Sequence, residues 1–277
     1  MNAIFVNAHL IPDDKKEIVD AYLVVEGKTI KEATYKDISK HYPDFEVIDL
    51  KGKYVLPGAI DLLYSGTRLK NSGITSVLLK DDTKEGEARI LGRHLINDPK
   101  ISEDVKMISG DPANHPDPGN VKKGMGYCEL SMEQCLKAIE RGYDAFTDCF
   151  NEMGSYQLKD LNMVNALFML EDVYKLVSID RKIADKKVFY DLLKHSRKDR
   201  ICLISNKIDD FNLMIRDLFE QKDISLRDIV AYTSINPARY LGLEQRIGSL
   251  SKGKKADLVI YDEKLNVVKT MIDGEFV

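Results

Sequence analysis

Hydrophobic and polar positions alternate over short stretches at both ends of the chain, which is the pattern of β-strands. Near the N-terminus, strands are expected at 3–6, 21–25 and 46–50, with turns at Gly27 and Gly52 between them. Near the C-terminus, strands are expected at 257–262 and 266–272, followed by a turn at Asp273 and Gly274. Each block is too short to bury a core alone. We therefore predict that residues 1–53 and 245–277 pair into one small β-sandwich.

Residues 54–244 carry a series of β-branched apolar runs that suggests a parallel barrel. The eight runs are Val55–Ser65, Ile74–Leu79, Ala88–Ile96, Val105–Asp111, Met125–Leu130, Asp144–Phe150, Val173–Asp180 and Arg200–Asn206. In the second half, helices with one apolar face are expected at 134–141, 187–195 and 226–233, and Ser131 and Ser225 are the N-caps of two of them. The expected fold class is α/β: a TIM-like (β/α)8 barrel and a small β-sandwich built from both termini.

The first half of this barrel lacks sequence for its helices. Segments 80–87, 97–104 and 112–124 are short, polar and interrupted by Gly or Pro. A crossover between parallel strands normally contains a helix and a dozen or more residues. Two interpretations remain: the barrel is reduced in its first half, so that one flank lacks helical cover, or these strands are not all parallel.

Composition narrows the class of protein. The chain has 277 residues, of which 44% are hydrophobic and 31% charged, and a formal net charge of -4. No basic stripe is interleaved with aromatic residues, so nucleic acid is not an expected partner. The sequence shows neither a signal-peptide pattern nor an apolar run of about 18 residues, so we expect no membrane association and a cytoplasmic location. The cysteines are scattered singly in apolar segments, as reduced core thiols are.

Two motifs carry a family resemblance. The first is Tyr54-Val55-Leu56-Pro57-Gly58-Ala59-Ile60-Asp61, and the second begins at Asn236-Pro237-Ala238-Arg239 and continues through Arg246-Ile247-Gly248-Ser249-Leu250 to Ala256-Asp257. With them, nearly the whole chain resembles the N-acetylglucosamine-6-phosphate deacetylases of the amidohydrolase superfamily. The resemblance implies a hydrolase of carbon–nitrogen (amide) bonds, in which a divalent metal activates water and an Asp at the end of the eighth strand transfers the proton.

The residues at the implied metal and proton-transfer positions cannot do this chemistry. They are Leu63 and Ser65 for two His, Ile96 or Asn97 for a Glu, Tyr127 and Asp148 for two further His, and Asn206 for the catalytic Asp. Leucine cannot ligate a metal, and asparagine has no titratable carboxylate. At least three protein ligands are normal for a catalytic metal. We therefore expect no catalytic residue and no cofactor, with zinc or iron as the alternative.

A replacement metal site built from Asp148 and cysteines is an alternative that strand geometry disfavours. Neighbouring residues on a strand face opposite ways, so if Tyr127 and Asp148 face the barrel interior, the cysteines should face the helical layer. These cysteines are Cys128, Cys149 and Cys202. His94, which lies near a strand end, is interpreted as a single hydrogen-bonded histidine.

Three positions are candidates for binding substrate. The resemblance places a phosphate-binding Arg at Lys159, which keeps the charge without the bidentate fork, and a seventh-strand His at Lys182. Asn151 follows the sixth strand within the retained Phe150-Asn151-x-Met153. Its alternative role is to stabilise the loop backbone.

The leading hypothesis is a non-catalytic homologue of the deacetylases that is retained for sugar-phosphate binding or protein assembly. The alternative is a divergent amidohydrolase that acts on a phosphorylated amino sugar by a metal-independent step using Lys182, Asp148 or Tyr127. Missing helices would leave apolar strand faces at 74–79 and 105–108 in contact with water, so we expect a homodimer or another protein to cover this flank. Otherwise, the polar linkers fold over these strands.

Overall fold

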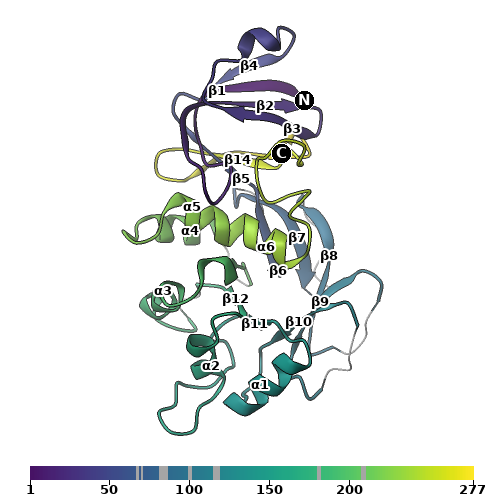
Figure 1. The fold of residues 1–277 in the computed structure, drawn as a ribbon, viewed down its shortest axis with the longest axis vertical. Helices are drawn as coiled ribbons and strands as arrows, with labels where there is room; N and C mark the ends of the chain where they lie inside the picture. Colours follow the sequence, from purple (N-terminus) through teal and green to yellow (C-terminus); the bar gives the residue numbers. More distant parts are fainter. Residues whose placement is uncertain are drawn as a thin grey trace.

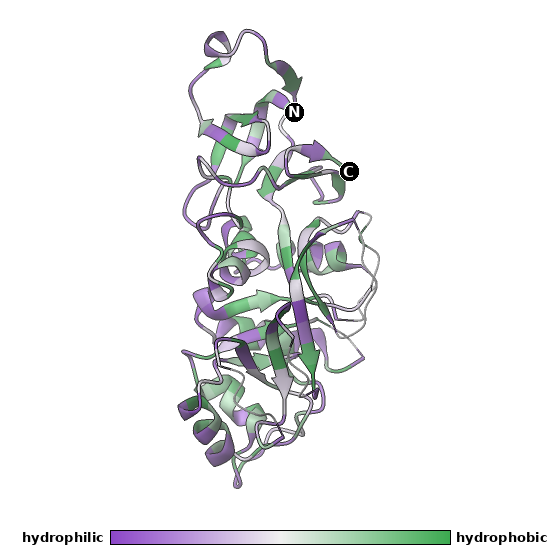
Figure 2. Cartoon of the chain, turned by 90° about the vertical axis from the view of Figure 1, so that its right-hand side faces the viewer, coloured by the Kyte–Doolittle hydropathy of each residue, from purple (hydrophilic) through white to green (hydrophobic). Residues whose placement is uncertain are grey.

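The computed structural model describes residues 1–66, 69, 71–80, 87–98, 102–114, 119–179, 182–206 and 210–277. The molecule is elongated, with strands from both termini at one end and a barrel at the other (Figure 1). The strands are largely hydrophobic, and the hydrophilic residues gather in loops and on the outer sides of helices (Figure 2). No helix in the described ranges is long and apolar enough to cross a bilayer.

Both ends of the chain contribute to one eight-stranded sheet, as the sequence predicts. Its strands are β1 (Asn2–Leu10), β2 (Ile18–Glu26), β3 (Thr29–Thr34), β4 (Glu46–Asp49), β5 (Tyr54–Pro57), β14 (Leu258–Tyr261), β15 (Val267–Ile272) and β16 (Glu275–Phe276). They lie in the order β16-β15-β14-β5-β1-β2-β3, and β4 pairs with β1. Buried residues such as Phe5, Leu23, Leu258 and Met271 form one core between the N-terminal and C-terminal strands. A short 3-10 helix, η1 (Ser39–His41), precedes β4.

The second sheet is an eight-stranded, nearly closed parallel barrel. Its strands are β6 (Ala59–Tyr64), β7 (Ile74–Lys80), β8 (Arg89–Ile96), β9 (Val105–Gly110), β10 (Lys122–Met125), β11 (Ala145–Thr147), β12 (Tyr174–Val177) and β13 (Ile201–Leu203). Each strand pairs in parallel with the next. The first and last strands meet where the amide of Asn206 donates to the carbonyl of Leu63 at 3.3 Å and the amide of Ser205 donates to Oδ1 of Asp61 at 3.2 Å.

Two strand predictions need correction. The strand predicted at Val55–Ser65 is divided, because β5 ends at Pro57 in the terminal sheet and β6 begins at Ala59 in the barrel. Gly58 lies between them. A Cβ at this position would come within 2.2 Å of the Thr75 side chain, so the close approach of the chain to Thr75 needs a glycine. The strand predicted at Met125–Leu130 is Lys122–Met125. Its lysines suggested a loop, yet Lys123 is buried and its Nζ donates to the Arg141 carbonyl at 3.1 Å.

Parallel pairing of the first strands excludes the interpretation that these strands are not all parallel. β6 to β9 pair only in parallel, and the described residues between them contain no helix. A seven-residue strand such as β7 is about 23 Å long, and an extended segment of eight residues reaches about 26 Å or slightly more. A short linker can therefore return along a strand without a helix.

The helices of the barrel follow β10 within the described ranges. They are α1 (Met132–Glu140), α2 (Met163–Met169), α3 (Lys186–Lys194), the 3-10 helix η2 (Lys198–Arg200), α4 (Phe211–Phe219), α5 (Leu226–Val230), the π-helix η3 (Ala231–Ile235) and α6 (Asn236–Tyr240). Ser131 and Ser225 cap α1 and α5 as predicted, each with a reciprocal capping box. Helices α2 and α4 were not predicted. Asn162 and Asp210 cap them.

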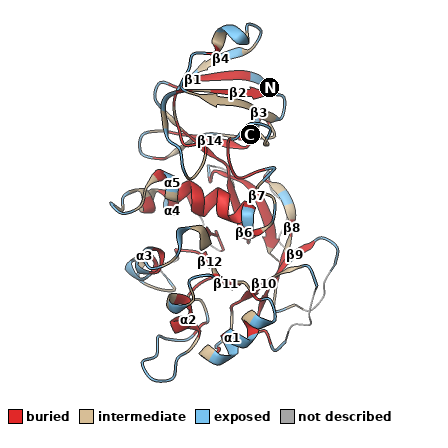
Figure 3. Ribbon diagram, viewed as in Figure 1, coloured by how far each residue is buried: buried red, intermediate tan, exposed pale blue. Residues whose placement is uncertain are grey.

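Many residues of the barrel strands and of the helices packed on them are buried (Figure 3). They form two clusters, one inside the barrel and one between its strands and helices. The interior cluster includes Leu62, Leu78, Met107 and Leu176 together with Tyr240 of α6. The outer cluster lies between the strands and the helices. It includes Phe146, Val177, Leu203, Phe189, Leu192, Met214 and Ile215. The interior is therefore a packed core, and functional groups are expected at the carboxyl ends of the strands.

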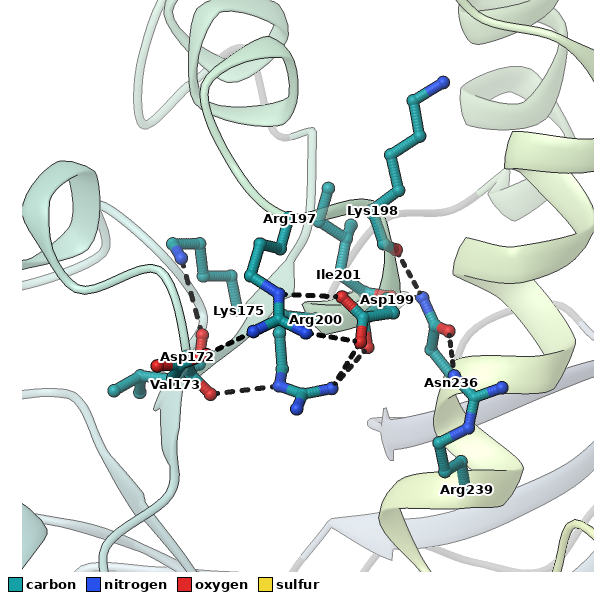
Figure 4. Close-up of polar contacts among 10 residues, drawn as sticks. All are labelled: Asp172, Val173, Lys175, Arg197, Lys198, Asp199, Arg200, Ile201, Asn236 and Arg239. Carbon is teal, nitrogen blue, oxygen red and sulfur yellow. Dashed lines mark hydrogen bonds and ion pairs between the residues drawn. The ribbon is translucent and has the colours of Figure 1, made fainter.

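Opposite those ends, polar contacts tie α6 to the start of β13 (Figure 4). The Nδ2 atom of buried Asn236 donates to the carbonyls of Lys198 at 2.7 Å and Ile201 at 2.8 Å. Nearby, Arg197 pairs with Asp172 and with Asp199. The Asn236-Pro237-Ala238-Arg239 motif therefore has a structural role at this face.

Candidate functional site

Asp148 is the centre of a polar cluster at the carboxyl ends of the last three strands. It follows β11, is fully buried, and accepts hydrogen bonds on both carboxylate oxygens. Ser178, which follows β12, donates to Oδ1 at 2.6 Å. Asn151 donates to Oδ2 at 2.6 Å, and Nδ2 of Asn206, which follows β13, donates to the same oxygen. The barrel thus brings together four polar residues from three strand ends.

Lys80 brings a positive charge to this cluster from the far side of the barrel seam. It is the last residue of β7 and is half-buried. Its Nζ donates to Oδ1 of Asn206 at 3.4 Å and lies 5.6 Å from the centre of the Tyr127 ring. The Asn206 amide therefore joins Lys80 on one side to Asp148 on the other.

The backbone at this edge adopts a conformation that is unusual for residues with a side chain. Asn97, Tyr127 and Asp148 follow β8, β10 and β11 with φ values of 52°, 55° and 55°. Left-handed φ values at non-glycine residues are uncommon and often occur at functional sites. These are three of the positions at which the resemblance places metal ligands, so the unusual backbone marks them as candidates for a functional site.

The electrostatics of Asp148 reflect burial opposed by its partners. Burial raises the pKa of Asp148 above its ordinary value, while hydrogen bonds from Ser178, Asn151 and Tyr127 and the charge of Lys80 work in the opposite direction. A carboxylate that accepts several hydrogen bonds and faces an ammonium group can be buried at moderate cost.

His94 is a buried histidine with partners on both ring nitrogens, as interpreted from the sequence. Its Nδ1 lies 2.7 Å from the Leu62 carbonyl, and its Nε2 lies 2.8 Å from Oγ of Ser109. Burial lowers the pKa of His94 to about 4, so the ring is neutral near pH 7. A neutral ring donates from Nδ1 to the carbonyl and accepts on Nε2 from the hydroxyl.

The remaining predicted positions lie apart from Asp148 or do not take part in its hydrogen bonds. Leu63 is buried in the barrel interior, Ser65 is half-buried after β6, and Ile96 packs partly against the interior cluster. Lys159 and Lys182 are both exposed, and neither makes the hydrogen bonds that hold Asp148. Their role in binding stays a prediction.

The cysteines follow the predicted facing only in part. Cys149 lies in the outer cluster and Cys128 packs partly against it, as predicted. Cys202 lies in the interior cluster, so that prediction is wrong. On β13 the apolar residues on either side of it, Ile201 and Leu203, face the helices, which turns Cys202 inward.

Sequence reasoning missed Lys80 and Ser178. Both follow apolar strand residues directly, at the end where barrel proteins carry functional groups. That position was the signal that could have identified them. The alignment with metal ligands drew attention to other strand ends.

A divalent metal, which the resemblance implies, does not fit these side chains. Both oxygens of Asp148 already accept N–H or O–H donors, and an amide stands at Asn206, where the resemblance places a carboxylate. Among the described residues, no group of three or more His, Cys, Asp or Glu side chains could hold a metal ion. The side chains present favour hydrogen bonding over coordination.

Comparison with known proteins shows what this chain is similar to. Residues 156–277 match the Amidohydrolase family. This match covers the C-terminal part of the chain. It is 35% identical over 74 residues to N-acetylglucosamine-6-phosphate deacetylase from Bos taurus, which covers 27% of this chain and 18% of the relative. It is 20% identical over 205 residues to N-acetylgalactosamine-6-phosphate deacetylase from Escherichia coli O157:H7, which covers 56% of this chain and 50% of the relative. Both matches span less than two thirds of the relative.

Solved structures share the fold of this chain. N-acetylglucosamine-6-phosphate deacetylase from Pasteurella multocida is similar with a TM-score of 0.84 and 17% identity, covering 100% of both chains. The enzyme from Mycobacterium smegmatis is similar with a TM-score of 0.82 and 17% identity, covering 99% of both chains. At these identities the likeness shows the fold, namely the barrel with its terminal β domain.

Proposed function

We propose that this chain is a non-catalytic amidohydrolase that is retained for binding a sugar phosphate at the mouth of its barrel or for protein assembly. One observation carries the proposal. The Asp148 carboxylate is held by amide and hydroxyl donors at the place where the resemblance puts a metal ligand. A hydrolytic amidohydrolase site needs a cation to activate water and a free carboxylate to move its proton.

The first experiment measures metal and activity in the same preparation. The purified full chain is analysed for zinc and iron by plasma mass spectrometry and assayed for acetate release from N-acetylglucosamine 6-phosphate. A catalytically active deacetylase is the positive control. We expect less than stoichiometric metal and no acetate release above the buffer rate. Stoichiometric metal together with acetate release would contradict the non-catalytic reading.

The second experiment tests binding by thermal shift. N-acetylglucosamine 6-phosphate and glucosamine 6-phosphate are compared with unphosphorylated N-acetylglucosamine and with inorganic phosphate. A ligand at about 100 times its Kd stabilises the folded protein by roughly 2.7 kcal/mol, which a thermal shift detects. Lys80→Met and Asn151→Ala should reduce the shift, whereas Lys137→Met on the exposed face of α1 should not. If no sugar phosphate shifts the melting temperature, the binding part of the proposal is wrong.

One observation favours the second candidate function, a metal-independent reaction on a phosphorylated amino sugar. Burial raises the pKa of Asp148, and general acids and bases often show such a shift. Any turnover seen by NMR in the presence of a chelator would support this function. Replacing Asp148 by Ala should then abolish the turnover, and replacing the exposed Asp44 by Ala should not.

Assembly has its own support on the helix-poor flank. A cavity of about 750 Å³ opens beside β8, β9 and β10. Its lining includes the apolar residues Ile90, Leu91, Leu241 and Leu243. A concavity that combines apolar residues with charged ones such as Arg89, Lys106 and Arg246 supports a protein partner, including a second copy of this chain, on a flank where the described residues between β6 and β9 contain no helix.

A further inference from the structure

The side chain at position 206 must do two opposite things in this structure. Its Oδ1 accepts from the Lys80 ammonium at 3.4 Å, and its Nδ2 donates to the Asp148 carboxylate. An amide can accept on one side and donate on the other, whereas an ionised carboxylate can only accept. A carboxylate at this position could meet Lys80 but would repel Asp148.

The cation and the anion that this amide joins form no direct ion pair among the described contacts. Both oxygens of Asp148 accept hydrogen bonds from Ser178, Asn151 or Asn206, and the Lys80 ammonium donates to Asn206. The two charges nevertheless act on each other, because Lys80 favours the ionised form of Asp148. The amide dipole of Asn206 is oriented to stabilise both charges at once.

We propose that Lys80, Asn206 and Asp148 act as one unit that replaces a metal centre, in which the Lys80 ammonium supplies the positive charge and Asn206 transmits its effect to Asp148. This inference concerns what holds the mouth of the barrel together and does not depend on which ligand binds there. It also explains why an amide stands where the resemblance places a catalytic carboxylate. The Asn206 side chain is required by its two neighbours.

The test first adds a second negative charge to the unit and then moves the original charge from position 148 to position 206. Asn206→Asp places two carboxylates in contact and should lower the melting temperature by about 5 °C or more. The double variant Asp148→Asn with Asn206→Asp restores a donor facing an acceptor and sets the carboxylate against Lys80. We expect the double variant to recover at least half of the loss, measured by circular dichroism on the full chain.

A matched control is available at the surface. Nδ2 of exposed Asn7 donates to Oδ1 of Asp49 at 2.9 Å, so Asn7→Asp creates the same pair of carboxylates in water. Screening by solvent should keep its effect to about 2 °C or less. If Asn206→Asp is no more destabilising than Asn7→Asp, the unit does not exist.

Three further results decide the proposal if Asn206→Asp fails to fold. A double variant that also fails to fold, or that melts no higher than the single variant, would overturn it. Lys80→Met should lower the melting temperature by about 3 °C or more because it leaves the buried Asp148 without a nearby cation. A rise in the melting temperature of the unmodified protein on addition of stoichiometric zinc would also overturn the proposal, since a centre that already has its cation has no place for another.

Discussion

Asp61 and His94 are two buried titratable residues of the barrel whose pKa values are shifted in opposite directions. Burial raises the pKa of Asp61 from 3.8 to about 6, against hydrogen bonds from Ser205 and from the amide of Leu63. Burial lowers the pKa of His94 from 6.5 to about 4. In both residues the cause is the same, because an apolar interior disfavours whichever form is charged.

The two residues should make opposite contributions to the pH dependence of stability. Asp61 has a raised folded-state pKa, so its contribution is fully present below pH 3.8 and is lost as the pH rises through about 6. His94 has a lowered pKa, so its contribution is present above pH 6.5 and is lost as the pH falls through about 4. Each shift of about two pKa units corresponds to roughly 3 kcal/mol. Between pH 4 and 6.5 the two contributions largely cancel.

Single substitutions should reveal the pH-dependent contribution of each residue to stability. Asp61→Asn should leave a protein that loses stability as the pH falls from 6.5 to 4, and His94→Gln should leave one that gains stability over the same range. The measurement is urea unfolding at several pH values, with the exposed Asp44→Asn as the control. If both variants keep the pH profile of the unmodified protein, the burial of these groups does not govern it.

At this scale, the sequence could predict which residues stand at the implied metal and proton-transfer positions but not which contacts these residues make. The resemblance identified Asp148 and Asn206 separately, each as a missing ligand or acid. Their hydrogen bond depends on how the ends of β11 and β13 meet, and no local pattern records that meeting. Lys80 comes from a strand on the other side of the seam, so its contact with Asn206 needed the closed barrel.

Among the elements, α6 shows how a family motif can be structural. Asn236 begins this helix on the face opposite to Asp148 and donates to two carbonyls around the start of β13 (Figure 4). Asn236→Ala should leave both carbonyls buried without a donor and lower the free energy of unfolding by about 2 kcal/mol. Asn236→Asp should cost more, since it sets a carboxylate against the two carbonyl oxygens. Chemical denaturation measures both.

The control for this prediction is Asn114→Ala, because Asn114 is exposed and its side-chain hydrogen bond to Asp111 is 3.5 Å long. A surface change of this kind should alter the free energy of unfolding by about 0.5 kcal/mol or less. Equal losses for Asn236→Ala and Asn114→Ala would show that the hydrogen bonds of Asn236 to the two carbonyls contribute nothing to stability.

Elements with a strong local signal were predicted, and elements defined by the surrounding structure were not. The caps at Ser131 and Ser225 and the apolar stripe of α3 indicated their helices correctly. Helix α2 has buried residues on nearly every side, so it lacks the amphipathic period that would have marked it. Strand β10 carries two lysines and a glycine, and its pairing with β9 and β11 makes that sequence a strand, with Lys123 buried and bonded to the Arg141 carbonyl.

For the molecule as a whole, we expect a partner at the flank formed by β6 to β9, where the described residues between the strands contain no helix. Leu95, Val105 and Ile108 of this flank are buried together in a small cluster. Their burial favours the view that much of the apolar strand face is covered within the chain. Ile90 on β8 is an exception, because 38% of its side chain is exposed and it lines the cavity beside β8 to β10. The cavity beside Ile90 is therefore the place at which we expect the proposed partner to bind.

A charge at Ile90 should separate such a partner from the barrel. If two copies associate through this flank, the unmodified protein sediments as a dimer at micromolar concentration. Ile90→Asp should then sediment as a monomer, because a carboxylate buried in an apolar contact without a counter-charge is costly. Val19→Asp, on the exposed surface of β2, is the control and should remain dimeric. A monomeric unmodified protein would remove the homodimer, and dissociation of both variants alike would place the contact elsewhere. Loss of association at Ile90 alone would connect the missing helices of the first half to assembly.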